Sequence, residues 1–230
     1  MKNFSEKFWD GPIYSPIFLP YNGGKNGKGG GGMAGTVWAL FWEGGLTGEI
    51  RTALLGKLSP ADRAQYGTFP SGGRAGARGR QFLLSRTLLA FALGETLGTV
   101  PALAKTAAGQ PYFPERPGFF LSLSHTEGAA LLALSDAPVG ADIERVRAIP
   151  PRLGRDFPGR EETFWRRWTA AEAAAKREGR GAGALLPLGR RGFPEGPEAR
   201  RLALRSGFAA ALAGEGAFTI RTVTAEELAE

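Results

Sequence analysis

The residues best suited to chemistry are three acids and one lysine in the second half of the chain. Asp142 and Glu144 lie in an apolar segment, 139–144, whose β-branched residues are typical of a strand. Side chains two apart on a strand share a face, so we expect both acids to point the same way. Glu172 and Lys176 lie four apart in a stretch, 161–178, without Gly or Pro, which predicts one helix face that carries both.

If this strand and helix pack together, the three carboxylates can meet with Lys176 beside them. Oxygen ligands suit a hard cation, and Mg²⁺ usually combines a few carboxylates with water and substrate phosphate oxygens. The chain has no Cys and one His, which excludes a structural zinc site of the thiolate type. The alternative interpretation is an acidic strand end next to a surface ion pair between Glu172 and Lys176.

Around these residues the chain resembles the 4′-phosphopantetheinyl transferases. It has V-G-A-D-I-E at 139–144 where the family has V/I-G-x-D-x-E, and W-T-A-A-E-A-A-A-K at 168–176 where the family has W-x-x-K-E-x-x-x-K. Upstream, G-Q-P-Y-F at 109–113 and F-F-L-S-L-S-H-T at 119–126 resemble the segment G-K/R-P-x-F…F-N-x-S-H-S. The motifs follow the family's order, and the long, surfactin-synthetase-activating type is the more similar.

The resemblance implies an α+β fold in which two similar α/β subdomains form a pseudo-dimer with the active site between them. Residues 1–35 are expected to be a flexible Gly-rich extension. Residues 36–137 would form an N-terminal subdomain that anchors coenzyme A, and 138–230 a C-terminal subdomain with the metal site and the catalytic helix.

The implied activity is that of a holo-[acyl-carrier-protein] synthase. Such an enzyme transfers the 4′-phosphopantetheine arm of coenzyme A to a serine of an apo carrier protein, needs Mg²⁺ and releases 3′,5′-ADP. The carrier would be an acidic protein of fatty-acid, polyketide or nonribosomal-peptide biosynthesis.

The resemblance also assigns roles to individual residues. Asp142, Glu144 and Glu172 would bind Mg²⁺, while Glu172 and Lys176 would act in catalysis. The residues expected to bind coenzyme A are Arg80, Gln110, Pro111, Ser124, His125 and Lys176. Among the basic residues near position 80, Arg80 is favoured as the 3′-phosphate ligand over its neighbours Arg74, Arg78 and Arg86.

Two positions depart from the family's pattern. Gln110 stands where the family often has a cation, so phosphate or adenine contacts are expected to weaken. Ala171 stands where the family commonly has Lys, so we expect altered affinity or partner range rather than a dead enzyme.

Composition limits the partners. The 230 residues carry a net charge of +7, which favours an acidic or phosphorylated partner: a nucleic acid, coenzyme A or an acidic carrier. No apolar run approaches the roughly 18 residues of a membrane span, and no secretory signal pattern opens the sequence, so a cytoplasmic protein is expected. The family's long form is usually monomeric. A nucleic-acid-binding protein and a coenzyme A-binding homologue with little turnover remain the alternatives.

Local patterns predict the elements that must position these residues. Strands are expected at 36–42, 119–124 and 129–134, with helices starting after Ser59 and spanning 80–97. Three closing strands are expected at 202–205, 209–212 and 218–223, the middle one weak because it is rich in Ala.

Overall fold

The computed structural model describes residues 35–70, 73–107, 109–150, 159–180 and 199–230. The extension expected at 1–35 lies outside these residues, except that Gly35 already belongs to the first strand. The described chain is mixed α and β, in agreement with the predicted α+β class. The expected likeness of its two halves, and hence the pseudo-dimer, stays a prediction.

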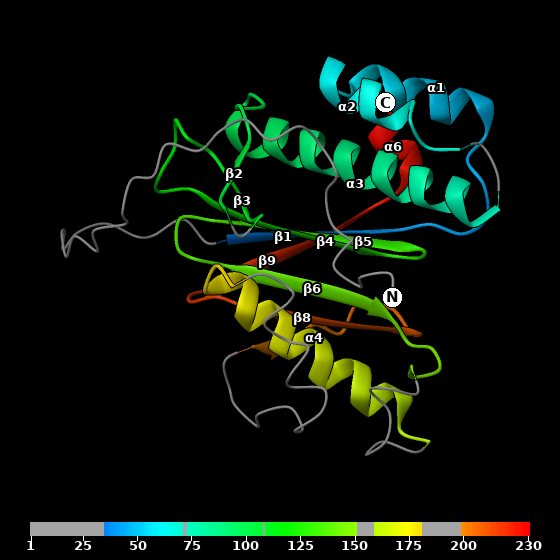
Figure 1. Ribbon diagram of the computed structural model, residues 1–230. Helices are drawn as coiled ribbons and strands as arrows, with labels where there is room; N and C mark the ends of the chain where they lie inside the picture. The colour runs from blue at the N-terminus through cyan, green and yellow to red at the C-terminus, as the bar shows by residue number, and fades with distance from the viewer. Residues whose placement is uncertain (1–34, 71–72, 108, 151–158, 181–198) are drawn as a thin grey trace.

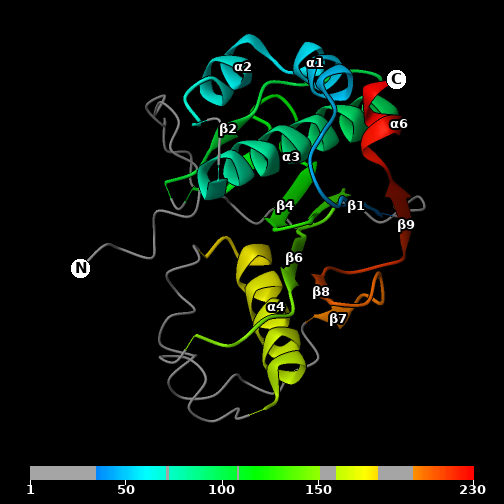
Figure 2. The ribbon, with the colours of Figure 1, turned by 90° about the vertical axis from the view of Figure 1, so that its right-hand side faces the viewer.

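The described elements form four layers (Figure 1). One group of helices lies on a first sheet, the opposite face of that sheet packs on a second sheet, and helix α4 (Glu161–Arg177) covers the far side of the second sheet. Figure 2, turned by 90°, shows α4 and the other helices again on opposite sides of the strands. The site-bearing elements therefore lie at an interface between sheets.

The strands β1, β4 and β5 of the first sheet are mostly buried, whereas its edge strand β9 is largely exposed. Its order is β4-β5-β1-β9, with β1 antiparallel to β5 and parallel to β9. Along β1 the side chains alternate, so that Trp38 and Leu40 pack towards the helices while Val37 and Ala39 pack towards the second sheet. The strands span Gly35–Phe41 (β1), Phe120–Thr126 (β4), Ala129–Ser135 (β5) and Phe218–Val223 (β9).

Local sequence signals explain the first helices. Ser59 caps α2 (Pro60–Tyr66) as predicted, because its hydroxyl accepts a hydrogen bond from the backbone of Asp62. The sequence analysis did not predict α1 (Gly48–Lys57), which Thr47 caps in the same way.

Helix α3 spans Gly73–Leu97 and so begins seven residues before the predicted start at 80. Glycine disfavours a helix interior, but a Cβ at Gly79 would lie 3.1 Å from the Cβ of Phe69. Close packing of the chain before the helix thus gives this glycine a structural role that compensates for its low helix propensity.

The second sheet has the order β6-β8-β7, all antiparallel. Its strands span Gly140–Arg145 (β6), Arg200–Arg201 (β7) and Phe208–Ala213 (β8). The Ala-rich β8, expected to be weak, is the central strand: Ala211 and Ala213 pack against Ala173 of α4, while Leu212 packs towards the first sheet. Small side chains on both partners let the helix lie close to the sheet.

The end of the chain returns to the first half of the molecule. Strand β9 pairs with β1, and α6 (Ala225–Ala229), capped by Thr224, packs with the helices over the first sheet. A short pair, β2 (Ala104–Lys105) and β3 (Pro111–Tyr112), precedes β4. None of the helices in the described ranges combines the length and apolar character that a membrane crossing requires.

Candidate functional site

The site begins with a close approach between β6 and α4. A Cβ at Gly140 would lie 1.9 Å from the carbonyl oxygen of Ala173 and 2.5 Å from the backbone nitrogen of Arg177, so only glycine fits. Alternation along β6 then directs Asp142 towards α4, while Ala141 and Ile143 are buried against the first sheet. The glycine of the strand motif thus brings the strand carboxylate to the helix.

Lys176 joins the strand acid to the helix acid. Its Nζ donates a hydrogen bond to Asp142 Oδ1 at 2.7 Å and lies 3.4 Å from Glu172 Oε1. It also donates to the backbone carbonyl of Ala141 at 3.2 Å. The Asp142 side chain is 2 % exposed and that of Glu172 6 %, so the two carboxylates share one cation away from bulk water.

Burial changes the proton affinity of this cluster. Loss of solvent, reinforced by the negative charge of Asp142, raises the pKa of Glu172 from 4.5 to about 7. Trp168 Nε1 donates to Glu172 Oε2 at 2.9 Å and favours the ionised form. For Lys176, burial opposes the charged form, but Asp142 and Glu172 outweigh it and raise the pKa, so the amine stays protonated.

Glu144, the other acid of the strand, has a second set of partners. Its Oε2 accepts hydrogen bonds from Thr126 at 3.0 Å and from Arg147 at 2.8 Å. The Arg147 guanidinium also lies 4.3 Å from the centre of the Trp165 ring. Within the described ranges no group of three or more His, Cys, Asp or Glu is assembled to hold a metal ion. The predicted convergence of all three acids on one metal ion stays a prediction.

Asp142 nevertheless offers an oxygen for a cation. Its Oδ2 is buried and has no hydrogen-bond partner among the described residues, whereas Oδ1 serves both Lys176 and Ser124. A buried carboxylate oxygen without a donor is costly and favours an ionic partner. Asp142 and Glu172 therefore fit Mg²⁺, which needs only one or two carboxylates beside phosphate and water.

Ser124 and His125 lie on opposite faces of β4. The Ser124 side chain points to β6 and donates to Asp142 Oδ1 at 2.6 Å. His125 is half-buried and, by alternation, shares the face of Leu121 and Leu123, which pack with α3. The role predicted for both in binding coenzyme A stays a prediction.

Gln110 connects the loop between β2 and β3 to the end of α4. Its Nε2 donates to the carbonyl oxygen of Lys176 at 2.8 Å, across 66 residues of sequence. Its Oε1 lies close to Gly179, where a Cβ would come within 3.0 Å. Pro111 follows in β3, paired with Lys105. The uncharged side chain thus reaches the backbone of a predicted catalytic residue.

The arginines considered for the 3′-phosphate differ in their burial and in their partners. The Nε of Arg80 is buried and lacks a hydrogen-bond partner among the described residues. Arg86 pairs with Asp62, with 3.1 Å between Nε and Oδ1, and Arg78 is exposed. The side chain of Arg74 lies outside the described residues. The rank of Arg80 as the 3′-phosphate ligand stays a prediction.

Sequence reasoning missed several neighbours of the site. The hydroxyls of Ser122 and Thr126, the clamp of Arg147 and the bond from Trp168 to Glu172 were not predicted. For Trp168 the signal was present, since it lies four residues before Glu172 on the same helix face. The others depend on packing between elements far apart in sequence.

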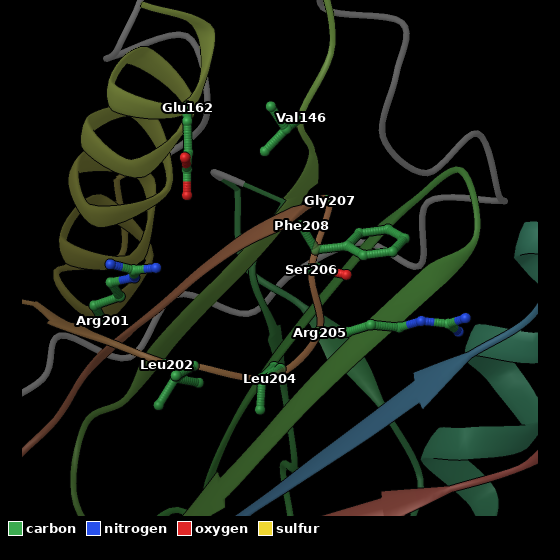
Figure 3. A pocket seen from close by; sticks show the side chains of 10 residues that line it. Val146, Glu162, Arg201, Leu202, Leu204, Arg205, Ser206, Gly207 and Phe208 are labelled. Atoms are coloured by element: carbon green, nitrogen blue, oxygen red, sulfur yellow. The ribbon is translucent and has the colours of Figure 1, made fainter.

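A pocket of about 550 Å³ lies elsewhere (Figure 3). It is formed by Val146, Glu162 and the segment from Arg201 to Phe208 between β7 and β8. None of the residues predicted for chemistry or coenzyme binding lines it. The cluster of Asp142, Glu172 and Lys176 therefore lies outside this pocket.

Comparison with known proteins adds an independent finding. Over 164 residues the chain is 34 % identical to the 4′-phosphopantetheinyl transferase AcpT of Escherichia coli strain K12, and equally to that of Escherichia coli O157:H7. The alignment covers 62 % of this chain and 76 % of each relative. No family model matches the chain.

Proposed function

Because this chain belongs to the 4′-phosphopantetheinyl transferases, we propose that it transfers the 4′-phosphopantetheine arm of coenzyme A to a serine of an apo carrier protein. The observation that carries the proposal is the buried group formed by Asp142, Glu172 and Lys176, with a spare carboxylate oxygen. Two acids and a fixed ammonium suit a reaction that depends on positioning and charge neutralisation.

In the proposed step the carrier serine attacks the β-phosphorus of coenzyme A. A new oxygen–phosphorus bond forms, the bond to the leaving 3′,5′-ADP oxygen breaks, and the serine proton goes to Glu172. A pKa of about 7 suits a carboxylate that accepts a proton near neutral pH. Lys176 would hold the pyrophosphate with its ammonium, and Trp168 would keep Glu172 in position.

Asp142 and Glu172 would hold Mg²⁺, with Glu144 as the third acid that the resemblance assigns. When bound, the ion supplies positive charge to the pyrophosphate oxygens as negative charge develops on them. Glu144 is close enough to contribute to the raised pKa of Glu172, although its own partners are Thr126 and Arg147.

The coenzyme would lie between the two halves. Arg80, with its spare donor, would bind the 3′-phosphate, and His125 would contact a phosphate from the end of β4. Gln110 and Pro111 would line the nucleotide, and Ser124 remains a predicted contact. We also propose the surfactin-synthetase-activating type, a monomer, a cytoplasmic location and an acidic carrier of fatty-acid, polyketide or nonribosomal-peptide synthesis.

Intact-mass analysis of an apo acyl carrier protein tests the function. After incubation with this protein, coenzyme A and Mg²⁺, the carrier should gain one phosphopantetheine arm, and excess chelator should stop the gain. Glu172→Gln keeps the size of the side chain and should abolish transfer. Glu162→Gln on the same helix is the control, because that side chain is 62 % exposed and pairs only locally with Arg166.

One observation favours a second candidate, a coenzyme A-binding homologue with little turnover. Ala171, at the position of the family's Lys, packs with the aromatic cluster of Phe164 and Trp165. Coenzyme A binding in calorimetry, without any mass gain on several carriers, would support this candidate against the transferase.

A further inference from the structure

Three hydroxyls lie on one face of β4, at alternate positions. Ser122, Ser124 and Thr126 are 4 %, 2 % and 7 % exposed, and all three point towards β6. Strands β4 and β6 belong to different sheets, so no main-chain ladder connects them. The polar face of β4 is therefore at the junction between the two sheets.

These hydroxyls provide hydrogen bonds between β4 and β6 in place of main-chain pairing. Ser122 Oγ accepts a hydrogen bond from the backbone nitrogen of Ala141 at 2.9 Å. Ser124 and Thr126 accept from the next alternate nitrogens of β6, those of Ile143 and Arg145, at longer distances of 3.4 Å. All three hydroxyls thus accept a hydrogen bond from a backbone nitrogen of β6, and the bond to Ser122 is the shortest of these three.

As donors the hydroxyls differ. Ser122 turns to the backbone carbonyl of Ala141 at 3.4 Å. Ser124 donates to Asp142 Oδ1 at 2.6 Å, and Thr126 donates to Glu144 Oε2 at 3.0 Å. At 2.6 Å, the bond from Ser124 is in the range of strong, charge-assisted bonds between a hydroxyl and a carboxylate. Two of the three hydroxyls thus orient acids, and one only connects backbones.

The bond from Ser124 fixes the orientation of the Asp142 carboxylate. Ser124 and Lys176 both use Oδ1, so that Oδ2 remains buried without a partner. Without the Ser124 bond, the carboxylate plane can turn about its last side-chain bond, and the oxygen that lacks a partner no longer points in a fixed direction. At Glu144, Thr126 and Arg147 both donate to Oε2, so the Thr126 hydroxyl helps to orient this carboxylate in the same way.

We infer that Ser124 and Thr126 are positioning residues, whose hydroxyls hold Asp142 and Glu144 in the orientation that receives Mg²⁺; this rests on the proposed function. Groups that orient metal ligands commonly change metal affinity or activity by about 10- to 100-fold when removed. This role of Ser124 is separate from the coenzyme A contact that the resemblance assigns to it.

The test measures Mg²⁺ affinity directly. Mg²⁺ is titrated by calorimetry into the full chain saturated with coenzyme A, with no carrier present. Ser124→Ala and Thr126→Val should each weaken Mg²⁺ binding by about tenfold or more. Thr126→Ser keeps the hydroxyl and should bind Mg²⁺ like the wild type.

Ser122→Ala is the matched control. It removes the shortest of the bonds between a β4 hydroxyl and the β6 backbone, so it should lower the melting temperature, yet leave Mg²⁺ affinity unchanged. The inference is overturned if Ser124→Ala binds Mg²⁺ like the wild type, or if Ser122→Ala weakens binding equally. A wild-type chain that binds no Mg²⁺ would refute the proposed metal site as well, which separates the two failures.

Discussion

Gly140 offers the sharpest test of how the site is assembled. Replacing it by Ala adds one methyl group at the contact between β6 and α4. That carbon would start 1.9 Å from the carbonyl oxygen of Ala173, and both neighbours are backbone atoms that no rotamer change can move aside. The helix, the strand or both must therefore shift.

The size of the shift follows from ordinary contact distances. To lengthen a 1.9 Å contact to the 3.4 Å of ordinary van der Waals contact, α4 must retreat by about 1.5 Å. The same helix carries Glu172 and Lys176, so both move away from Asp142. A displacement of about 1 Å at a catalytic group can cost about 100-fold in rate, and overpacking of this kind costs about 3 kcal/mol of stability.

The assay compares carrier modification rates and urea unfolding of Gly140→Ala with those of Gly94→Ala. Gly94 is an exposed position of α3, where a Cβ meets nothing within 4 Å, so alanine there should leave activity unchanged and stabilise by about 0.5–1 kcal/mol. Wild-type rate and stability in Gly140→Ala would refute the argument that this close approach sets the site.

Two further predictions concern neighbours of the same helix. The pKa of Glu172 is about 7 in the folded chain and 4.5 in the unfolded chain, so between these pH values the folded chain keeps a proton that the unfolded chain loses. Without metal, the unfolding free energy should therefore fall by roughly 3 kcal/mol as the pH rises from 4.5 to about 7, at about 1.4 kcal/mol per pKa unit. Urea titrations across this pH range should show this fall in the unfolding free energy, and the fall should be smaller in Glu172→Gln. An unfolding free energy that does not change with pH would contradict the prediction. In addition, Mg²⁺ affinity should drop as the pH falls below about 7. Gln110→Met keeps the length of the side chain but loses the bond to Lys176 O, which should lower the unfolding free energy by about 1 kcal/mol; because this bond also holds the backbone of Lys176 at the helix end, kcat should fall as well. Initial-rate measurements decide this, and an unchanged kcat would show that the loop does not position the helix end.

The sequence predicted those parts of the site that depend on local periodicity. Spacing on a helix placed Glu172 next to Lys176, and alternation on a strand buried Ile143 while turning Asp142 the other way. These patterns need only the geometry of one element and an apolar core to face.

What the sequence did not predict depends on contacts between distant segments. The start of α3 was missed because glycine propensity is local, whereas the packing of Gly79 on Phe69 is tertiary. The bond from Gln110 to Lys176 and the hydroxyls of β4 on β6 require two elements to be docked before any pattern appears. The Ala-rich β8 was judged by propensity, although its small side chains serve the close contact with α4.

The pairing of β1 with β9 has a consequence for biosynthesis. The two strands lie side by side, yet one is made near residue 35 and the other near residue 220. A chain emerging from the ribosome can close the hairpin of β4 and β5 early, but β1 keeps an open edge until the last strand arrives. Such edges invite association with other chains, and long-range pairing slows folding. Shortening the chain before Phe218 should therefore reduce soluble yield even though every residue proposed for catalysis is retained.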